Sequence, residues 1–114
     1  MLCDLDFDLA QQLERVLKQQ DVTSEFCLNL DTALQRLEET CPDVVFCGFT
    51  NSLNAFLDAV SSKRRKIPVI VVSRHPEVNQ WIDALEAGAA DYCAAPFEPT
   101  HMRWVLATAS LAAA

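Results

Sequence analysis

The chain has 114 residues, the length of about one domain, and 51% of them are hydrophobic, which is enough for a core of ordinary size. Its net charge of -7 and isoelectric point near 4.6 argue against nucleic acid and anionic membranes as partners, because binding phosphates needs clustered Lys or Arg. No apolar run approaches the roughly 18 residues of a membrane span, and no basic segment followed by an apolar one opens the chain, so we expect a cytoplasmic protein.

In the first part of the chain, the sequence pattern predicts a strand, a helix, a strand and a helix. The segment "MLCD" is a very short first strand, because only three residues precede Asp4. A helix is predicted from Asp8 to Gln20, and a less regular run from Val22 to Leu28 predicts a strand. The next helix spans 29–40, with Asp31 as its candidate cap. Apolar residues at helical spacing mark the two helices: Leu9, Leu13, Val16 and Leu17 in the first, and Leu30, Leu34 and Leu37 in the second.

The middle of the chain centres on one apolar strand. Pro42 ends the preceding helix, and the unbroken run Val44–Cys47 predicts a strand that is buried on both faces. That strand ends at Gly48. A third helix begins at Leu53 and ends in the basic run Lys63–Lys66.

The last third repeats the alternation. "IPVIVVS", residues 67–73, is a β-branched strand, and 75–88 is a helix with Pro76 in its first turn and Gly88 as its C-terminal cap. "DYCAAPF" is a short strand, after which Pro99 opens a last helix from about Thr100 onward. Strict alternation of strands and helices predicts right-handed crossovers and an α/β fold with helices on both faces of a parallel sheet. We expect one compact domain over residues 1–114.

Cysteine usage favours packing over chemistry. The five cysteines include no CxxC pair. Free cysteine inside an apolar run serves as a small hydrophobe, whereas metal ligands need clustered spacing. We therefore expect core positions for the four that lie in such runs, Cys3, Cys27, Cys47 and Cys93.

An acidic cluster follows the predicted first strand. Asp4, Asp6 and Asp8 could hold Mg²⁺, since carboxylates at a strand's carboxyl end are suitable ligands. Acids also favour the positive end of a helix, which explains Asp6 and Asp8 without any metal. The helix interpretation is favoured over Mg²⁺ binding, because a further ligand would be expected where Gly48 stands.

Other candidate sites give weak signals. His75 and His101 stand at predicted helix starts, far from any nucleophile pattern, and are interpreted as surface residues. The basic run Lys63–Lys66 suits the carboxyl end of its helix, which is favoured over a phosphate-binding patch. With only two glycines, Gly48 and Gly88, the chain has neither a P-loop nor a GxGxxG motif.

Five segments, in this order and with these gaps, carry a family resemblance: "DFDLAQQLERVLKQQ", "CPDVVFCG", "IPVIVVS", "ALEAGAADY" and "APFEP". Together they resemble the receiver domain of two-component response regulators, over almost the whole chain. The resemblance implies a three-layer, flavodoxin-like (βα)5 fold with strand order 2-1-3-4-5. In that family an acidic pair after strand one holds Mg²⁺ and an aspartate ending strand three accepts a phosphoryl group. A Thr or Ser ending strand four and a Lys in strand five bind that group, and an aromatic residue in strand five reports the change.

The resemblance places substitutions at the acidic positions. Asp4 matches the first acid, but Leu5 stands at the second, which Asp6 could replace only if the register slips. Gly48 occupies the phosphoacceptor position. The loop from Gly48 to the helix at Leu53 is shorter than the family's usual loop.

Of the remaining positions, two match the family's pattern and two depart from it. Ser73 retains the hydroxyl of strand four, and Tyr92 retains the aromatic residue. Arg74 replaces the usual small residue, and Ala95 replaces the lysine. Arg74 is predicted to pair with Asp4 or Asp6.

These substitutions predict a pseudo-receiver: a non-enzymatic signalling domain without cofactor, acting by protein contact, with Mg²⁺ binding weak at most. Two alternatives stay open. One is a small-molecule-binding flavodoxin-like domain, and the other is a phosphorylatable receiver using Asp43 or Asp6 in an unusual register.

The partner is expected to be another protein or an output domain fused after Ala114. In the last helix, Met102, Val105, Leu106 and Ala109 are enough to cover the sheet. Trp104 and Leu111 lie on another side, which predicts a homodimer interface shared with the Trp81 helix and the Tyr92 strand. The alternative is that Trp104 packs against a neighbouring helix or a downstream domain.

Overall fold

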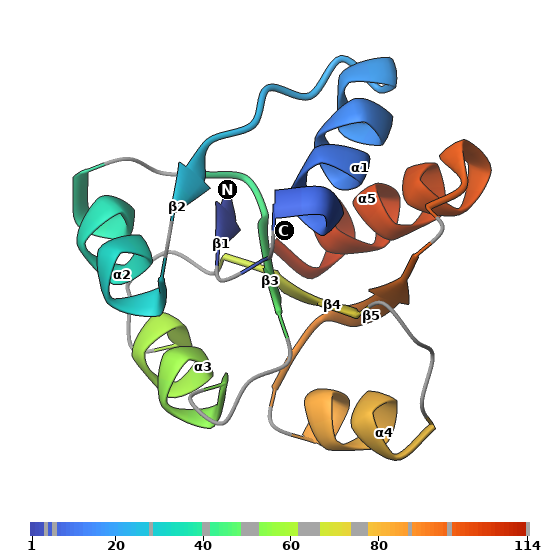
Figure 1. Ribbon diagram of the computed structural model, residues 1–114. Coiled ribbons are helices and arrows are strands. Elements are labelled where there is room, and N and C mark those ends of the chain that lie inside the picture. The colour runs from blue at the N-terminus through green and yellow to red at the C-terminus, as the bar shows by residue number, and fades with distance from the viewer. Residues whose placement is uncertain are drawn as a thin grey trace.

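The computed structural model describes residues 1–3, 5, 7–27, 29–39, 42–48, 53–61, 67–73, 78–86, 88–95 and 97–113. Strands and helices alternate strictly along them (Figure 1). The strands are β1 Leu2–Cys3, β2 Phe26–Cys27, β3 Val45–Gly48, β4 Val69–Ser73 and β5 Asp91–Ala94. The helices are α1 Phe7–Gln19, α2 Leu30–Glu39, α3 Leu53–Ser61, α4 Val78–Glu86 and α5 Pro99–Ala113.

The five strands form one parallel sheet in the order β2-β1-β3-β4-β5, which confirms the predicted fold class. Helices α1 and α5 lie side by side on one face, and α2, α3 and α4 cover the other (Figure 1). This three-layer arrangement follows from the sequence, because strands that are apolar on both faces need helices on both sides.

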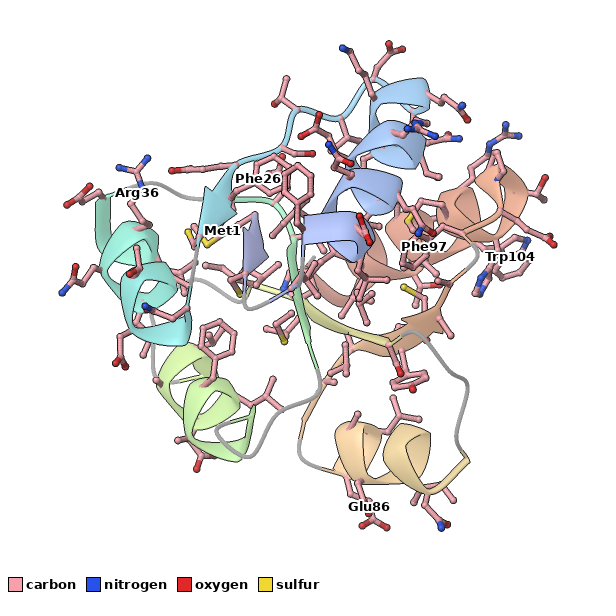
Figure 2. The ribbon with its side chains drawn as sticks, in the orientation of Figure 1. Met1, Phe26, Arg36, Glu86, Phe97 and Trp104 are labelled. Carbon is pink, nitrogen blue, oxygen red and sulfur yellow. The ribbon has the colours of Figure 1, made fainter. Side chains whose placement is uncertain are left out.

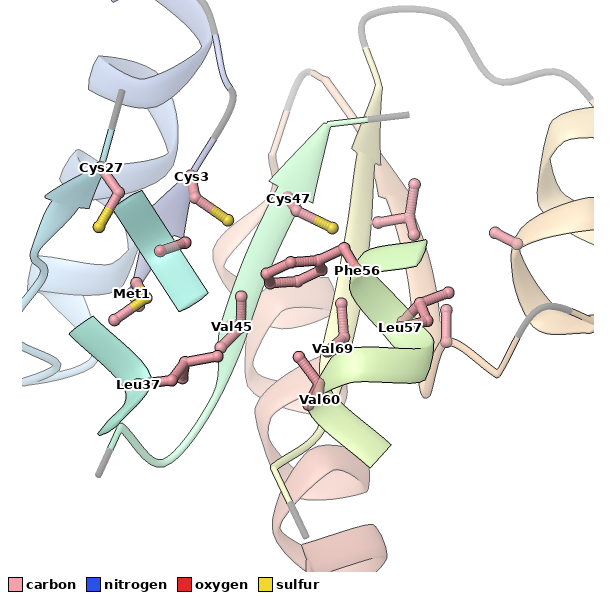
Figure 3. Packing of buried hydrophobic residues seen from close by; sticks show 14 residues of the cluster. Met1, Cys3, Cys27, Leu37, Val45, Cys47, Phe56, Leu57, Val60 and Val69 are labelled. Atoms are coloured by element: carbon pink, nitrogen blue, oxygen red, sulfur yellow. The ribbon is translucent and has the colours of Figure 1, made fainter. Parts of the chain in front are cut away.

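Two apolar clusters fill the space between the layers. The cluster on the α1 and α5 face contains Leu2, Phe46, Ile70, Val72 and Cys93 from the strands, with Leu13, Leu17, Met102 and Val105 from the helices. The cluster on the other face contains Cys3, Cys27, Val45, Cys47, Val69 and Val71, with Leu37, Phe56, Leu57, Val60 and Ala84 from the helices (Figure 3). The alternation of strand residues between the two clusters is the period of two expected of a pleated sheet.

Two boundary predictions are wrong. The strand expected over 22–28 is limited to Phe26–Cys27, because β1 begins only at Leu2 and leaves the preceding segment without a neighbouring strand. The cap of α2 is Asn29 rather than Asp31: Asn29 Oδ1 accepts a hydrogen bond from the Thr32 amide at 2.8 Å, the usual bond of an N-cap residue. Asp31 lies in the first turn, where its charge suits the helix dipole.

The carboxyl ends of α1 and α4 close in the same way. After α4, the Gly88 amide donates to the Leu85 carbonyl at 3.2 Å and the Ala89 amide donates to the Ala84 carbonyl at 3.0 Å. This pair of bonds is a Schellman motif, which needs a residue with positive φ, and Gly88 has φ 111. Gly88 is therefore a C-terminal cap, as predicted. The corresponding residue after α1 is Asp21, with φ 60.

Replacing Gly88 with alanine is expected to lower the free energy of unfolding by about 1 to 2 kcal/mol, because an L side chain is strained at this φ. A Cβ there would meet nothing within 4 Å, so the cost comes from the backbone and not from a clash. Urea unfolding measures it, with Gly88→Asn as a control that should cost less. Wild-type stability in Gly88→Ala would contradict the assignment of this cap.

Candidate functional site at the carboxyl edge of the sheet

The sheet brings several predicted site residues to one edge. Because all the strands are parallel, their carboxyl ends meet there, and such an edge is where open α/β sheets bind ligands. Gly48 ends β3, opposite Val72 of β4, and Ser73 ends β4, opposite Ala94 of β5. Ala95 follows directly, and its amide donates to the Ser73 carbonyl at 2.9 Å. Gly48, Ser73 and Ala95 thus lie on three consecutive strand ends, although Ala95 stands one residue beyond β5.

Few reactive or charged side chains occur among the described residues of this edge. Gly48 is buried, and Ser73 and Ala95 are half-buried. The described residues at the carboxyl ends of β1, β3, β4 and β5 carry neither a carboxylate nor an ammonium group: Cys3, Leu5, Gly48, Ser73, Ala94 and Ala95. A phosphoryl group at this edge would find from them one hydroxyl, but no nucleophilic carboxylate and no cation.

Three predicted site residues, Asp4, Asp6 and Arg74, lie outside the described residues. Their pairing and the weak Mg²⁺ site stay predictions. His75 and the basic run Lys63–Lys66 lie outside them too. Asp8 is exposed in the first turn of α1, as the helix interpretation requires. Elsewhere in the described chain, no three His, Cys, Asp or Glu side chains are grouped so as to hold a metal ion.

Tyr92 lies on the same face of the sheet as Ser73. It stands opposite Val71 in the register, is half-buried, and packs against the apolar cluster under α2, α3 and α4. Its amide donates to Asp91 Oδ1 at 2.7 Å. Tyr92 and Ser73 therefore lie diagonally opposite each other on the neighbouring strands β5 and β4, on one face of the sheet.

Asp43 lies at the opposite edge of the sheet. It is exposed and precedes β3, whereas Gly48 ends that strand. Five residues of extended chain span about 16 Å, so the Asp43 carboxylate cannot join Ser73 in one site. This geometry disfavours the alternative in which Asp43 accepts a phosphoryl group.

The four described cysteines are buried. Cys3 is the register partner of both Cys27 and Cys47, so these thiols form a row on the face covered by α2 and α3 (Figure 3). Burial, helped by the negative charge of Asp91, raises the pKa of the Cys93 thiol to about 12. A thiol that stays protonated in the core is a packing group, as predicted.

Helix α5 divides its apolar residues as predicted. Met102, Val105 and Ala109 are buried against the sheet, whereas the Trp104 side chain is 72% exposed and points away from the body of the molecule (Figure 2). His101 is exposed beside it. The side chains of Leu111 and Trp81 lie outside the described ones, so their part in an interface stays a prediction.

One feature that the sequence prediction missed is an apolar groove between α1 and β2, of about 410 Å³. Phe7 is 74% exposed and Phe26 is 51% exposed at its rim. The exposure of Phe7 could have been predicted from the sequence, because Phe7 lies off the apolar helix face formed by Leu9 and Leu13.

Known proteins resemble this chain both in sequence and in architecture. Residues 1–107 match the family described as response regulator receiver domain. The chain is 33% identical over 90 residues to the alginate biosynthesis transcriptional regulatory protein AlgB of Pseudomonas syringae pv. tomato, covering 76% of this chain and 19% of AlgB. The receiver domain of NtrX from Brucella abortus superposes with a TM-score of 0.83 at 22% identity, covering 96% of each chain. The beryllofluoride-activated NtrC4 receiver domain dimer superposes with a TM-score of 0.83 at 18% identity, covering 99% and 96%.

The chain spans only 19% to 43% of the length of the curated relatives that it matches. In the described part of the chain, no helix has both the length and the apolar character needed to cross a bilayer.

Proposed function

Because this chain belongs to the response regulator receiver domains of two-component signalling, we propose that it is a pseudo-receiver, which signals by protein contact and not by accepting a phosphoryl group. The observation that carries this proposal is the pair Gly48 and Ala95 at the carboxyl edge of the sheet. On this proposal the domain is not an enzyme and needs no cofactor.

The chemistry of phosphoryl transfer explains why these two positions matter. Transfer to a carboxylate needs that carboxylate as the nucleophile and cations that neutralise the phosphoryl oxygens. Gly48 offers no side chain, and the Ala95 methyl group offers no charge. Ser73 can donate one hydrogen bond, which does not replace a nucleophile.

The domain is therefore expected to form no covalent adduct when it is incubated with acetyl phosphate and Mg²⁺. Intact-protein mass spectrometry checks this, and a titration with beryllofluoride and Mg²⁺ checks for a non-covalent mimic. A receiver that keeps the aspartate and lysine serves as the positive control. A stoichiometric adduct would overturn the proposal, and mapping it to Asp6 would support the phosphorylatable alternative.

We further propose that residues 1–114 are the receiver module of a longer regulator, with an output domain after Ala114. The relative AlgB is named a transcriptional regulatory protein, and this chain covers 19% of it. A signal that reaches this domain would then pass to the output domain through a shared surface. Sequencing the reading frame beyond Ala114 tests this organisation directly.

The surface best suited to such contact is the exposed side of α5. An exposed tryptophan is a common interface anchor, and Trp104 stands clear of the core that Met102 and Val105 fill. The similar NtrC4 receiver domain is described as a dimer. These observations support self-association of this chain through α5.

Replacing Trp104 with glutamate is expected to weaken self-association by at least about tenfold while leaving the fold intact, because the side chain makes little contact with its own core. Analytical ultracentrifugation over a concentration series measures this, and circular dichroism reports the fold. Phe7→Glu is a matched control, since Phe7 is equally exposed on a different helix. A wild type that stays monomeric at high concentration would rule out the homodimer.

A further inference from the structure

Strand β2 forms one edge of the sheet, beside the groove between α1 and β2. The strand order places β2 at the end, with β1 as its sole neighbour among the described strands. The Leu2 amide donates to the Glu25 carbonyl at 2.7 Å, so the main-chain groups of Glu25 face β1. Because these groups alternate sides along a strand, the amide and carbonyl of Phe26 face the open side. An edge that presents such groups is a template for a further strand.

Apolar side chains line the groove next to this edge. Phe7 and Ala10 line it from α1, Phe26 lines it from β2, and Leu2 and Leu5 line it as well. Figure 2 shows the Phe26 side chain between β2 and α1. Charged side chains commonly protect an edge strand, whereas the edge residue here is a phenylalanine that is 51% exposed. The volume of about 410 Å³ lies within the range of roughly 300 to 1,000 Å³ that is usual for ligand pockets.

The one charged side chain among the described residues that line the groove is acidic. Glu14 and Gln11 supply its polar lining, and Glu14 makes no ion pair within the described part of the chain. The basic residues of the same helix, Arg15 and Lys18, do not line the groove. A second copy of this chain, whose net charge is -7, would bring an equally acidic groove. A basic partner is therefore favoured over self-association at this edge.

We propose that the β2 edge and its groove bind an extended segment of another protein, with apolar side chains toward α1 and a basic residue beside Glu14. The segment adds a strand to the sheet by bonding to the Phe26 amide and carbonyl. In such strand addition, main-chain bonds supply affinity and side-chain pockets supply specificity. Alternate residues of an extended chain point to one side, so the apolar and basic residues should alternate with others. This surface is separate from Trp104 of α5, and the proposal holds whether or not the domain accepts a phosphoryl group.

The test uses the synthetic peptide Lys-Thr-Phe-Thr-Val-Thr-Lys, blocked at both ends, which carries its apolar and basic residues on one side when extended. Isothermal titration calorimetry with the 114-residue chain is expected to show saturable binding of one peptide per chain. The matched peptide Glu-Thr-Phe-Thr-Val-Thr-Glu should bind at least about fivefold more weakly, because its carboxylates meet Glu14. No binding of the lysine peptide, or equal affinity of the two peptides, would overturn the proposal.

Methylation of the peptide main chain separates strand addition from mere apolar adsorption. One version carries N-methyl groups on the three threonines, and the other carries them on the phenylalanine and valine. Only one of these two sets of amides faces β2 in an added strand, the threonine set if the strand is parallel and the other set if it is antiparallel. One version is therefore expected to lose binding while the other keeps it. Equal binding of both versions, whether tight or weak, would contradict strand addition.

Variants of the chain place the binding site. Glu14→Lys is expected to reverse the preference, so that the glutamate peptide binds more tightly than the lysine peptide. Phe26→Glu should weaken binding of the lysine peptide by at least about tenfold, with circular dichroism as the check of folding. Trp104→Glu is the matched control and should bind the peptide as the wild type does. An unchanged preference in Glu14→Lys would overturn the proposal. So would a loss of self-association in Phe26→Glu, which would assign the edge to a second copy.

Discussion

Replacing Gly48 with aspartate, the residue that the proposed function expects of a phosphorylatable receiver at this position, is expected to lower the free energy of unfolding by about 2 to 3 kcal/mol, because the new carboxylate would be buried. Gly48 is buried at the end of β3, and the described residues of this edge supply no cation for a carboxylate. Burial should raise the pKa of the new carboxyl group, so the deficit should be largest above that pKa and shrink as the pH falls. Urea unfolding at several pH values measures both effects.

A second substitution tests whether Ala95 stands at the position of the lysine that, on the proposed function, this site lacks. Gly48 and Ala95 lie two strands apart and two residues out of register, about 12 Å by the usual strand dimensions, so a lysine at 95 can reach a carboxylate at 48. The double variant Gly48→Asp, Ala95→Lys is expected to recover about 1 kcal/mol relative to the sum of the single effects. Gly48→Asn is the control for size without charge. A Gly48→Asp variant as stable as the wild type would show that the edge already neutralises a carboxylate there.

The absence of charge among the described residues of this edge also affects the resting state that the proposed function requires. If protein contact has replaced phosphorylation, the empty site removes the repulsion that clustered carboxylates impose on an active receiver. The resting state is then set by packing alone, with Ser73 and Tyr92 held on one face of the sheet. A single preferred state, without a ligand to select another, is what a constitutive docking domain requires.

The fold could be predicted because local and tertiary signals agree. The β-branched run in β4 can only be a strand buried on both faces, and the apolar faces of α1 and α5 repeat at helical spacing. The boundaries failed where tertiary context decided them. Val22–Glu25 has strand-like composition but no neighbouring strand. Asn29 and Asp31 are both suitable cap residues, and the hydrogen bond from the Thr32 amide to Asn29 decides between them.

The candidate site was only partly predictable. The convergence of Gly48, Ser73 and Ala95 follows from parallel topology, so three positions far apart in the sequence could be placed at one edge. Exposure of Trp104 was predictable from helical spacing, whereas a binding partner for it needs information beyond one chain.

Replacing Phe56 with alanine is expected to have the largest effect of any substitution considered, lowering the free energy of unfolding by about 3 to 5 kcal/mol. Phe56 is 1% exposed and fixes α3 against the sheet, where its ring lies beside Cys47 (Figure 3). Its removal loses the transfer free energy of the ring and leaves a cavity that α3 and the rigid central strands can fill only partly. Since small domains are stable by about 5 to 15 kcal/mol, the variant should be close to unfolding at 37 °C. Phe7→Ala removes the same ring from an exposed position and should cost under about 1 kcal/mol, so equal urea midpoints for the two variants would contradict the packing of α3 on β3.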